Sequence, residues 1–236
     1  MGAYIGIDLG TTYSAVAYLD DLGRPIIIDN PNGKDGSNIT PSNITILNGE
    51  FVVGRVARQL YQDKKDSLGR FKSEMGSGKT LELAGKEITP MELSSIVLKD
   101  MLRIAEEEVG EVSKAVVTIP ANFSNEAREA TLKAAKLAGL DVDFIINEPT
   151  AAALYYAFES GEELSGNYAI YDLGGGTFDI SIIRVNGQSQ EVLASNGLNK
   201  LGGDDFDKAI QELVREKYKA ETKNPLEDYE YTLIQA

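Results

Sequence analysis

The sequence contains no cysteine and no histidine. Without cysteine the chain can form no disulfide and carry out no thiol chemistry, and nothing indicates an oxidising compartment. Without histidine it cannot carry a Ser-His-Asp hydrolase triad, a Cys-His protease pair or a histidine-ligated zinc ion. Proton transfer must therefore use carboxylates, lysine or tyrosine, and any metal must be a hard cation bound through oxygen.

Long apolar runs and a basic N-terminal segment are also missing. No stretch stays apolar over the length of a membrane span, and residues 1–7 lack the basic region and apolar core of a signal peptide. The net charge is −14, which disfavours non-specific binding to nucleic acid and to anionic membranes. We therefore expect a soluble cytoplasmic protein with no nucleic-acid and no membrane partner. A phosphate ligand would need a local site and a cation to screen it.

The order of expected strands and helices indicates an α/β fold in two lobes. Three strands open the chain, helices and strands then alternate in the order α-β-α-β-α, and three more strands and a helix follow. A run of three strands therefore occurs twice along the chain, which suggests two related lobes. We predict a β-β-β-α-β-α-β-α first lobe over residues 1–161, a small insert subdomain within it over about 37–88, and an incomplete second lobe over 162–236.

One helix start carries several independent sequence signals. Thr89 is a suitable N-cap, Pro90 suits the first helical position, and Glu92 completes a capping box. Apolar residues then recur at helical spacing until Gly110. This pattern predicts an amphipathic helix that packs against the sheet.

Two segments repeat the core Asp-Leu-Gly, each directly after an apolar strand. Residues 7–12 read IDLGTT and residues 171–177 read YDLGGGT. Glycine lets the backbone approach a ligand closely, and consecutive N–H groups with threonine hydroxyls form a concave anion site. An aspartate at each strand end can hold a hydrated divalent cation beside the phosphates. Two ordinary hairpins with Asp-Gly turns are the alternative, but two related lobes that grip one nucleotide explain the repeat better.

A third glycine-rich segment, Gly76-Ser77-Gly78-Lys79-Thr80, resembles a P-loop only in part. The full pattern needs a glycine five positions before Gly78, where the chain has Ser73. A polar stretch precedes the segment, where a P-loop follows a hydrophobic strand. We expect a surface loop there.

The motifs together are similar to the DnaK-type (seventy-kilodalton heat-shock) chaperones of the actin and sugar-kinase superfamily. The matching words are IGIDLGTTYSAVA (5–17), ITPS (39–42), VVTIPANFSNEAREAT (116–131), AGL (138–140), INEPTAAALYYA (146–157), YDLGGGTFDISI (171–182) and NKLGGDDFD (199–207). They follow the family's order along nearly the whole chain. The resemblance implies the actin-like ATPase fold, which is of the ribonuclease H-like kind, and an enzyme that hydrolyses ATP.

The resemblance also implies roles for individual residues. Lys72 aligns with the lysine that orients the attacking water, Glu148 with a glutamate that positions water and metal, and Pro120 and Arg128 with a relay to other domains. Asp172 and Thr177 complete the implied catalytic set. The implied carboxylates around Mg²⁺, which act largely through water, are Asp8, Asp172 and Asp179. The implied contacts of ATP or ADP are Gly10, Thr11, Thr12, Tyr13, Lys72, Gly174, Gly175, Gly176, Thr177, Gly202 and Gly203.

Physical arguments support several of these roles and add two expectations. Phosphoryl transfer needs positioning and charge neutralisation, which a lysine such as Lys72 supplies. Glu148 precedes Pro149 and should lie at a helix N-terminus, where the helix dipole stabilises a carboxylate. Gly202 and Gly203 should form a tight turn, and Asp204 and Asp205 should cap the following helix. Besides Mg²⁺, K⁺ is a second candidate for the ion bound at this site.

The resemblance further implies a chaperone ATPase domain that gates peptide binding. The implied partners are unfolded or extended client peptides, a J-domain cochaperone and a nucleotide-exchange factor. We expect this chain to be an N-terminal fragment that lacks the adenosine-holding part and the peptide-binding domain, and that binds ATP weakly. The alternatives are an actin-class nucleotide-dependent assembly protein and a small-molecule kinase of the same fold. A kinase needs a carboxylate base in a substrate pocket, and the sequence offers no dedicated candidate.

Overall fold

The computed structural model describes residues 2–31, 37–62, 65–161, 163–187, 189–198 and 201–226. The first lobe has the predicted β-β-β-α-β-α-β-α order. Its elements are β1 (Ala3–Asp8), β2 (Tyr13–Leu19), β3 (Pro25–Ile27), α2 (Pro90–Val109), β10 (Val112–Ile119), α3 (Asn125–Leu137), β11 (Val142–Asn147) and α4 (Glu148–Ser160). No helix in the described part of the chain is long and apolar enough to cross a membrane.

The central sheet of the first lobe determines where the functional side chains lie. Its strand order is β11-β10-β1-β2-β3, and β1 runs parallel to β10, which runs parallel to β11. Ile7 pairs with Val117, and Ile119 pairs with Asn147. The carboxyl ends of all three parallel strands therefore meet at one edge of the sheet, which is where ligands bind in open α/β sheets.

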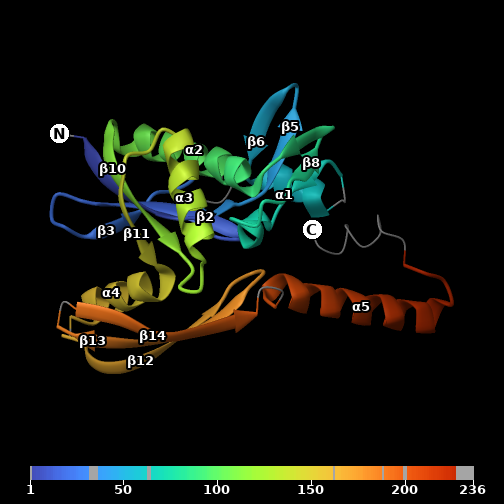
Figure 1. Ribbon diagram of the computed structural model, residues 1–236. Helices are drawn as coiled ribbons and strands as arrows, with labels where there is room; N and C mark the ends of the chain where they lie inside the picture. The colour runs from blue at the N-terminus through green and yellow to red at the C-terminus, as the bar shows by residue number, and fades with distance from the viewer. Residues whose placement is uncertain are drawn as a thin grey trace.

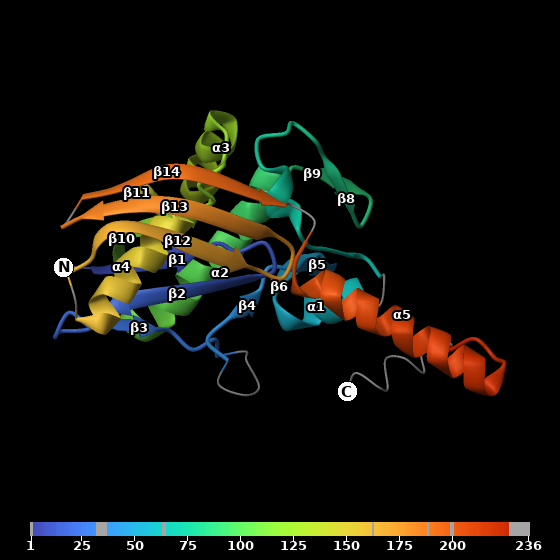
Figure 2. The ribbon, with the colours of Figure 1, turned by 90° about the horizontal axis from the view of Figure 1, so that it is seen from below.

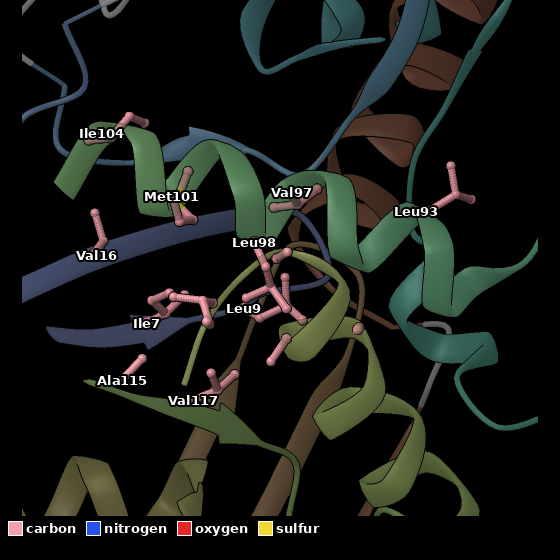
Figure 3. Close-up of a cluster of buried hydrophobic side chains, with 14 of the residues drawn as sticks. Ile7, Leu9, Val16, Leu93, Val97, Leu98, Met101, Ile104, Ala115 and Val117 are labelled. Carbon is pink, nitrogen blue, oxygen red and sulfur yellow. The ribbon is translucent and has the colours of Figure 1, made fainter. Parts of the chain in front are cut away.

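Helix α2 packs on one face of this sheet and forms the main core with it (Figure 3). Its Leu93, Val97, Leu98 and Met101 are fully buried, and they lie over the apolar side chains of β1, β2 and β10. The predicted capping box is present, because the Thr89 hydroxyl accepts from the Glu92 amide and the Glu92 carboxylate accepts from the Thr89 amide. The helix ends at Gly110, whose φ is 75°.

The insert subdomain lies between β3 and α2 and contains short elements. They are β4 (Thr40–Pro41), β5 (Ile44–Leu47), β6 (Glu50–Val53), α1 (Arg55–Gln62), β7 (Ser67–Leu68), the 3₁₀-helix η1 (Phe71–Glu74), β8 (Leu81–Leu83) and β9 (Lys86–Ile88). The segment that resembles a P-loop is a turn that connects η1 to β8, as predicted. Its Lys79 pairs with Glu74 at 2.8 Å on the surface.

The second lobe repeats the three-strand opening of the first. Its elements are β12 (Ser165–Leu173), β13 (Phe178–Asn186), β14 (Ser189–Leu198) and α5 (Gly203–Thr222). The strands form an antiparallel sheet in the order β12-β13-β14. Figures 1 and 2 show α4 between this sheet and the first lobe, and Ala153 of α4 belongs to the small core of the second lobe. The domain boundary at residues 161 and 162 stays a prediction.

Helix α5 projects from the end of the second sheet (Figure 1). None of its residues is buried, and Phe206, Ile210 and Leu213 on its apolar face are exposed. The apolar face of α5 is therefore not buried by any part of the chain that the structure describes. The predicted second lobe also includes residues 227–236, which lie outside the described part of the chain.

Candidate active site

A cavity of about 1120 Å³ opens between the two lobes, at the edge where β1, β10 and β11 end. The two repeated hairpins form opposite parts of its wall. The predicted site residues that line it are Asp8, Gly10, Thr11, Thr12, Tyr13, Lys72, Glu148, Asp172, Gly174, Gly175, Thr177 and Asp179. Residues from distant parts of the sequence thus meet around one space.

The two hairpin loops touch each other, and each contains a position that has to be glycine. A Cβ added to Gly10 would lie 1.8 Å from the carbonyl oxygen of Tyr13, within the same turn. A Cβ added to Gly175 would lie 2.5 Å from Oγ1 of Thr12 in the other lobe. Real Cβ atoms do not approach other heavy atoms so closely. Glycine is therefore required for the turn at Gly10 and for the contact between lobes at Gly175.

Lys72 lies in η1 and is almost completely buried, with 4% of its surface exposed. Its Nζ is 2.6 Å from Oε1 of Glu148, at the start of α4, and 5.8 Å from the centre of the Phe123 ring. A buried charge needs a partner of opposite sign, and Glu148 is that partner. The structure therefore brings together Lys72 and Glu148, the two residues that the family resemblance implies position the water molecule.

Among the described residues, the charged side chains that line the cavity are four carboxylates and Lys72. Burial raises the pKa of the Glu148 carboxyl, Lys72 opposes this shift, and Asp8 and Asp172 add to it. Burial also raises the pKa of Asp172, with a further contribution from Asp8, and that of Asp179, with a further contribution from Asp172. The site therefore has excess negative charge, which a bound cation would neutralise.

Two polar residues that the sequence did not single out hold these carboxylates. The Thr118 hydroxyl, near the end of β10, donates to Oδ1 of Asp8 at 2.7 Å. The Asn122 side chain donates to Oδ1 of Asp179 at 3.2 Å, from the first lobe to the second. Thr118 lies just before the last residue of β10 and Asn122 lies shortly after the strand, so their position near a strand end is the signal that could have identified them.

Pro120 and Arg128 lie beside the site. Pro120 lines the cavity, and Arg128 donates to the carbonyls of Phe123 and Ala121 and to the side chain of Asn147. Asn147 directly precedes Glu148, so Arg128 connects α3 to the start of α4. Their role in a relay between domains stays a prediction.

Gly202 and Gly203 lie behind the second loop and do not line the cavity. A Cβ on Gly202 would lie 2.5 Å from the backbone of Gly175, and the Gly203 amide donates to the Gly174 carbonyl at 3.0 Å. The two glycines thus support the loop, and their assignment as nucleotide contacts stays a prediction.

The prediction that Asp204 and Asp205 cap α5 is wrong. The N-cap residue is Gly202, and no side chain caps this helix end. Both aspartates lie in the first turn and face cations of the first lobe. Asp204 is 3.8 Å from Arg58, and Arg70 is 4.0 Å from Asp204 and 3.7 Å from Asp205. Attraction between the lobes therefore draws these carboxylates away from the helix end.

The chain is similar in sequence to proteins of one known family. A family model described as "Hsp70 protein" matches residues 4–80 and 77–233. The chain is 43% identical over 217 residues to "Chaperone protein DnaK" of Metamycoplasma hominis, an alignment that covers 92% of this chain and 36% of the relative. It is 43% identical over 216 residues to "Chaperone protein DnaK" of Mycoplasmopsis pulmonis (strain UAB CTIP), covering 91% of this chain and 35% of the relative.

The chain spans about a third of the length of these curated relatives. The matches confirm the resemblance inferred from the sequence motifs and the actin-like fold class. They do not favour the assembly-protein and kinase alternatives. This chain belongs to the Hsp70 family.

Proposed function

We propose that the cavity between the lobes binds ATP with Mg²⁺ and hydrolyses it. The observation that carries the proposal is the meeting of two glycine-rich hairpin loops across one cavity, beside the buried pair Lys72–Glu148. Such loops suit the phosphates of a nucleotide, because their backbone N–H groups form a site for anions.

The buried hydroxyl of Thr12 is evidence for a ligand at the place where the two loops meet. Thr12 Oγ1 is buried and has no hydrogen-bond partner among the described residues. A buried hydroxyl without a partner is costly, and a phosphate oxygen would accept a hydrogen bond from it. This orphaned donor lies against Gly175, where both loops can reach the same phosphate group.

The donor set also fits Mg²⁺. Asp8, Asp172 and Asp179 offer oxygen atoms, which this ion prefers. No three acidic side chains in the described part of the chain lie close enough together to form a direct metal cage. That spacing suits an ion that keeps its water and is held through it. Bound Mg²⁺ would neutralise the phosphates, and K⁺ is a further candidate for the same carboxylate-rich wall.

Lys72 and Glu148 have complementary parts in the proposed reaction. Hydrolysis needs a water molecule aligned with the γ-phosphorus and a cation where negative charge develops. The Lys72 ammonium supplies that cation, and Glu148 holds it in place at 2.6 Å. Asp172 and Thr177 lie on the second lobe, where they complete the set around the transferred phosphoryl group.

In a longer protein, we assign this ATPase to a chaperone, which is what the matched relatives are named, and we propose that ATP hydrolysis gates peptide binding there. The corresponding partners are unfolded or extended client peptides, a J-domain cochaperone and a nucleotide-exchange factor, and the location is the cytoplasm. These assignments rest on family membership, whereas the nucleotide site rests on the residues of this chain.

The proposal is tested by ATP turnover of the longer protein with paired lysine variants. Lys72→Ala should lower the rate of hydrolysis at least tenfold, because one oriented cation is lost from the transition state. Lys79→Ala, in the segment that resembles a P-loop, should leave the rate unchanged. Equal turnover of wild type and Lys72→Ala would reject the assigned role of Lys72, and loss of turnover in Lys79→Ala would reject the surface-loop interpretation.

A further inference from the structure

Arg70 has an unusual backbone conformation directly before η1. Its φ of 60° and ψ of 15° lie in the left-handed region, which residues other than glycine seldom adopt. The Ser73 hydroxyl donates to the Arg70 carbonyl at 2.8 Å and holds this turn. Strained residues of this kind gather at functional sites, where the surrounding structure keeps them in place. The side chain of Arg70 shows what the turn achieves.

The Arg70 guanidinium reaches from the insert subdomain of the first lobe to the second phosphate loop. Nη2 donates to the carbonyl of Gly176 at 2.8 Å. A Cβ added to Gly176 would lie between 2.8 and 3.0 Å from Nη2, Nε and Cζ of Arg70. Gly176 therefore has to be glycine for the guanidinium to lie against the loop.

Two carboxylates of α5 face the guanidinium from its other side. Arg70 Nη1 is 4.0 Å from Asp204, and Nη2 is 3.7 Å from Oδ2 of Asp205. That Asp205 oxygen is buried and accepts no hydrogen bond from a described residue, and Arg70 is the cation beside it, while Lys208 of the same helix lies 3.5 Å from the other carboxylate oxygen. The Arg70 side chain is 21% exposed, and this shielding from water strengthens the attraction.

Arg70 completes a set of donors that occupies three consecutive carbonyls of the loop. The Gly203 amide donates to the carbonyl of Gly174 at 3.0 Å, and the Asp204 amide donates to that of Gly175 at 2.8 Å. Arg70 holds the third carbonyl, that of Gly176. Two donors thus come from the second lobe itself, and the third comes from the first lobe.

The carbonyl contacts determine where the loop amides point. In a planar trans peptide the N–H lies opposite to the C=O of the preceding residue. The amides of Gly175, Gly176 and Thr177 therefore point away from α5 and from Arg70. None of the three donates to an acceptor in the described part of the chain. Gly175 and Thr177 line the cavity, whereas Gly176 and the donors to the carbonyls do not, so the free amides of Gly175 and Thr177 face the cavity.

We propose that Arg70 is a positioning residue of the phosphate site. It orients the Gly176–Thr177 peptide from the opposite lobe, so that the Thr177 amide faces the nucleotide phosphates. Asp204 and Asp205 hold the guanidinium in place and neutralise its charge, which means that Arg70 acts through the loop and not as a phosphate ligand. This inference rests on the proposed function of the cavity, since it assigns a ligand to the oriented amides.

The test compares three variants of Arg70 with wild type. Arg70→Gln removes the charge, Arg70→Lys keeps the charge but lacks the planar fork, and Arg70→Gly removes the side chain while it suits the left-handed backbone. Arg184→Gln is the matched control, because it removes an exposed arginine of β13 that pairs with Glu191 of β14. Arg70→Gly keeps the test valid where another variant folds poorly.

The first readout is the mobility of the loop in the nucleotide-free protein. The backbone order parameters of Gly176 and Thr177, measured by ¹⁵N relaxation, should fall from about 0.85 toward 0.6 in all three Arg70 variants. Those of α2 should not change. Unchanged loop order parameters in Arg70→Gln and Arg70→Gly would overturn the inference. Wild-type values in Arg70→Lys would also overturn it, because a charge alone would then be enough.

The second readout is the affinity of the longer protein for Mg-ATP, Mg-ADP and adenosine. The Arg70 variants should bind both phosphate-bearing ligands several-fold more weakly, with no change for adenosine. An equal loss for adenosine would show a general structural defect and overturn the positioning role. If wild type binds none of the phosphate-bearing ligands, the proposed function fails, and the order parameters still decide the role of Arg70.

Discussion

The buried pair between Lys72 and Glu148 allows a quantitative test of the site. We consider Lys72→Met, which keeps an unbranched side chain but removes the charge. Glu148 would remain buried with no cation among the charged residues that line the cavity, and near Asp8 and Asp172. Removal of one partner from a buried ion pair typically costs about 3–5 kcal/mol. For a chain of this size the loss corresponds to a decrease of roughly 6–20 °C in melting temperature.

The pH dependence of the free energy of unfolding distinguishes an unpaired Glu148 charge from a packing defect. Burial already raises the pKa of Glu148 and Lys72 opposes the shift, so removal of Lys72 should raise that pKa further. A carboxyl whose pKa is higher in the folded than in the unfolded state favours folding at low pH and loses that contribution as pH rises. The deficit of Lys72→Met should therefore be larger at about pH 8 than at about pH 5.

The assay is urea unfolding at both pH values for wild type, Lys72→Met and the double variant Lys72→Met/Glu148→Leu. The double variant should recover most of the lost free energy of unfolding, because no uncompensated charge remains. A deficit in Lys72→Met below about 1 kcal/mol would refute the reasoning, since exposed pairs show that size. A deficit independent of pH, or no recovery in the double variant, would refute it as well.

Further predictions concern the helix cap, the core and the loop glycines. Thr89→Ala should lower the free energy of unfolding by about 1 kcal/mol through loss of the α2 cap, whereas Thr89→Ser should change it little, as urea unfolding would show. Leu98→Ala, at a position that is 0% exposed, should cost about 2–5 kcal/mol, and Leu213→Ala, at a position that is 64% exposed, should stay within about 0.5 kcal/mol of wild type. Gly10→Ala and Gly175→Ala should each weaken Mg-ATP binding at least tenfold in calorimetry, because the added Cβ collides with Tyr13 and with Thr12. Unimpaired binding in both glycine variants would contradict the loop geometry.

Features encoded by neighbouring residues were predictable from the sequence. The capping box of Thr89 and Glu92 lies within one turn, so its pattern directly implies its structure. The two Asp-Leu-Gly hairpins were predictable for the same reason, and the order of strands and helices along the chain could be read from the succession of local patterns. Short elements were harder: β8 and β9 have three residues each, too few to show a periodic pattern, although Leu83 of β8 is fully buried.

Contacts between distant residues account for what the sequence did not reveal. The bond from Thr118 to Asp8 joins positions 110 residues apart, and that from Arg70 to Gly176 joins positions 106 apart. The local pattern Gly-Gly-Asp-Asp before a helix suits an N-cap, which explains the wrong assignment of Asp204 and Asp205. Cations of the opposite lobe determine their true position, and no local pattern contains that information.

The most direct test of the central claim is calorimetric titration of this chain with ATP in the presence and absence of Mg²⁺. We expect weak but saturable binding that depends on Mg²⁺, is lost in Asp172→Asn and persists in Lys79→Ala. Binding that is the same without Mg²⁺, or that survives Asp172→Asn while Lys79→Ala abolishes it, would contradict a phosphate site between the two hairpins.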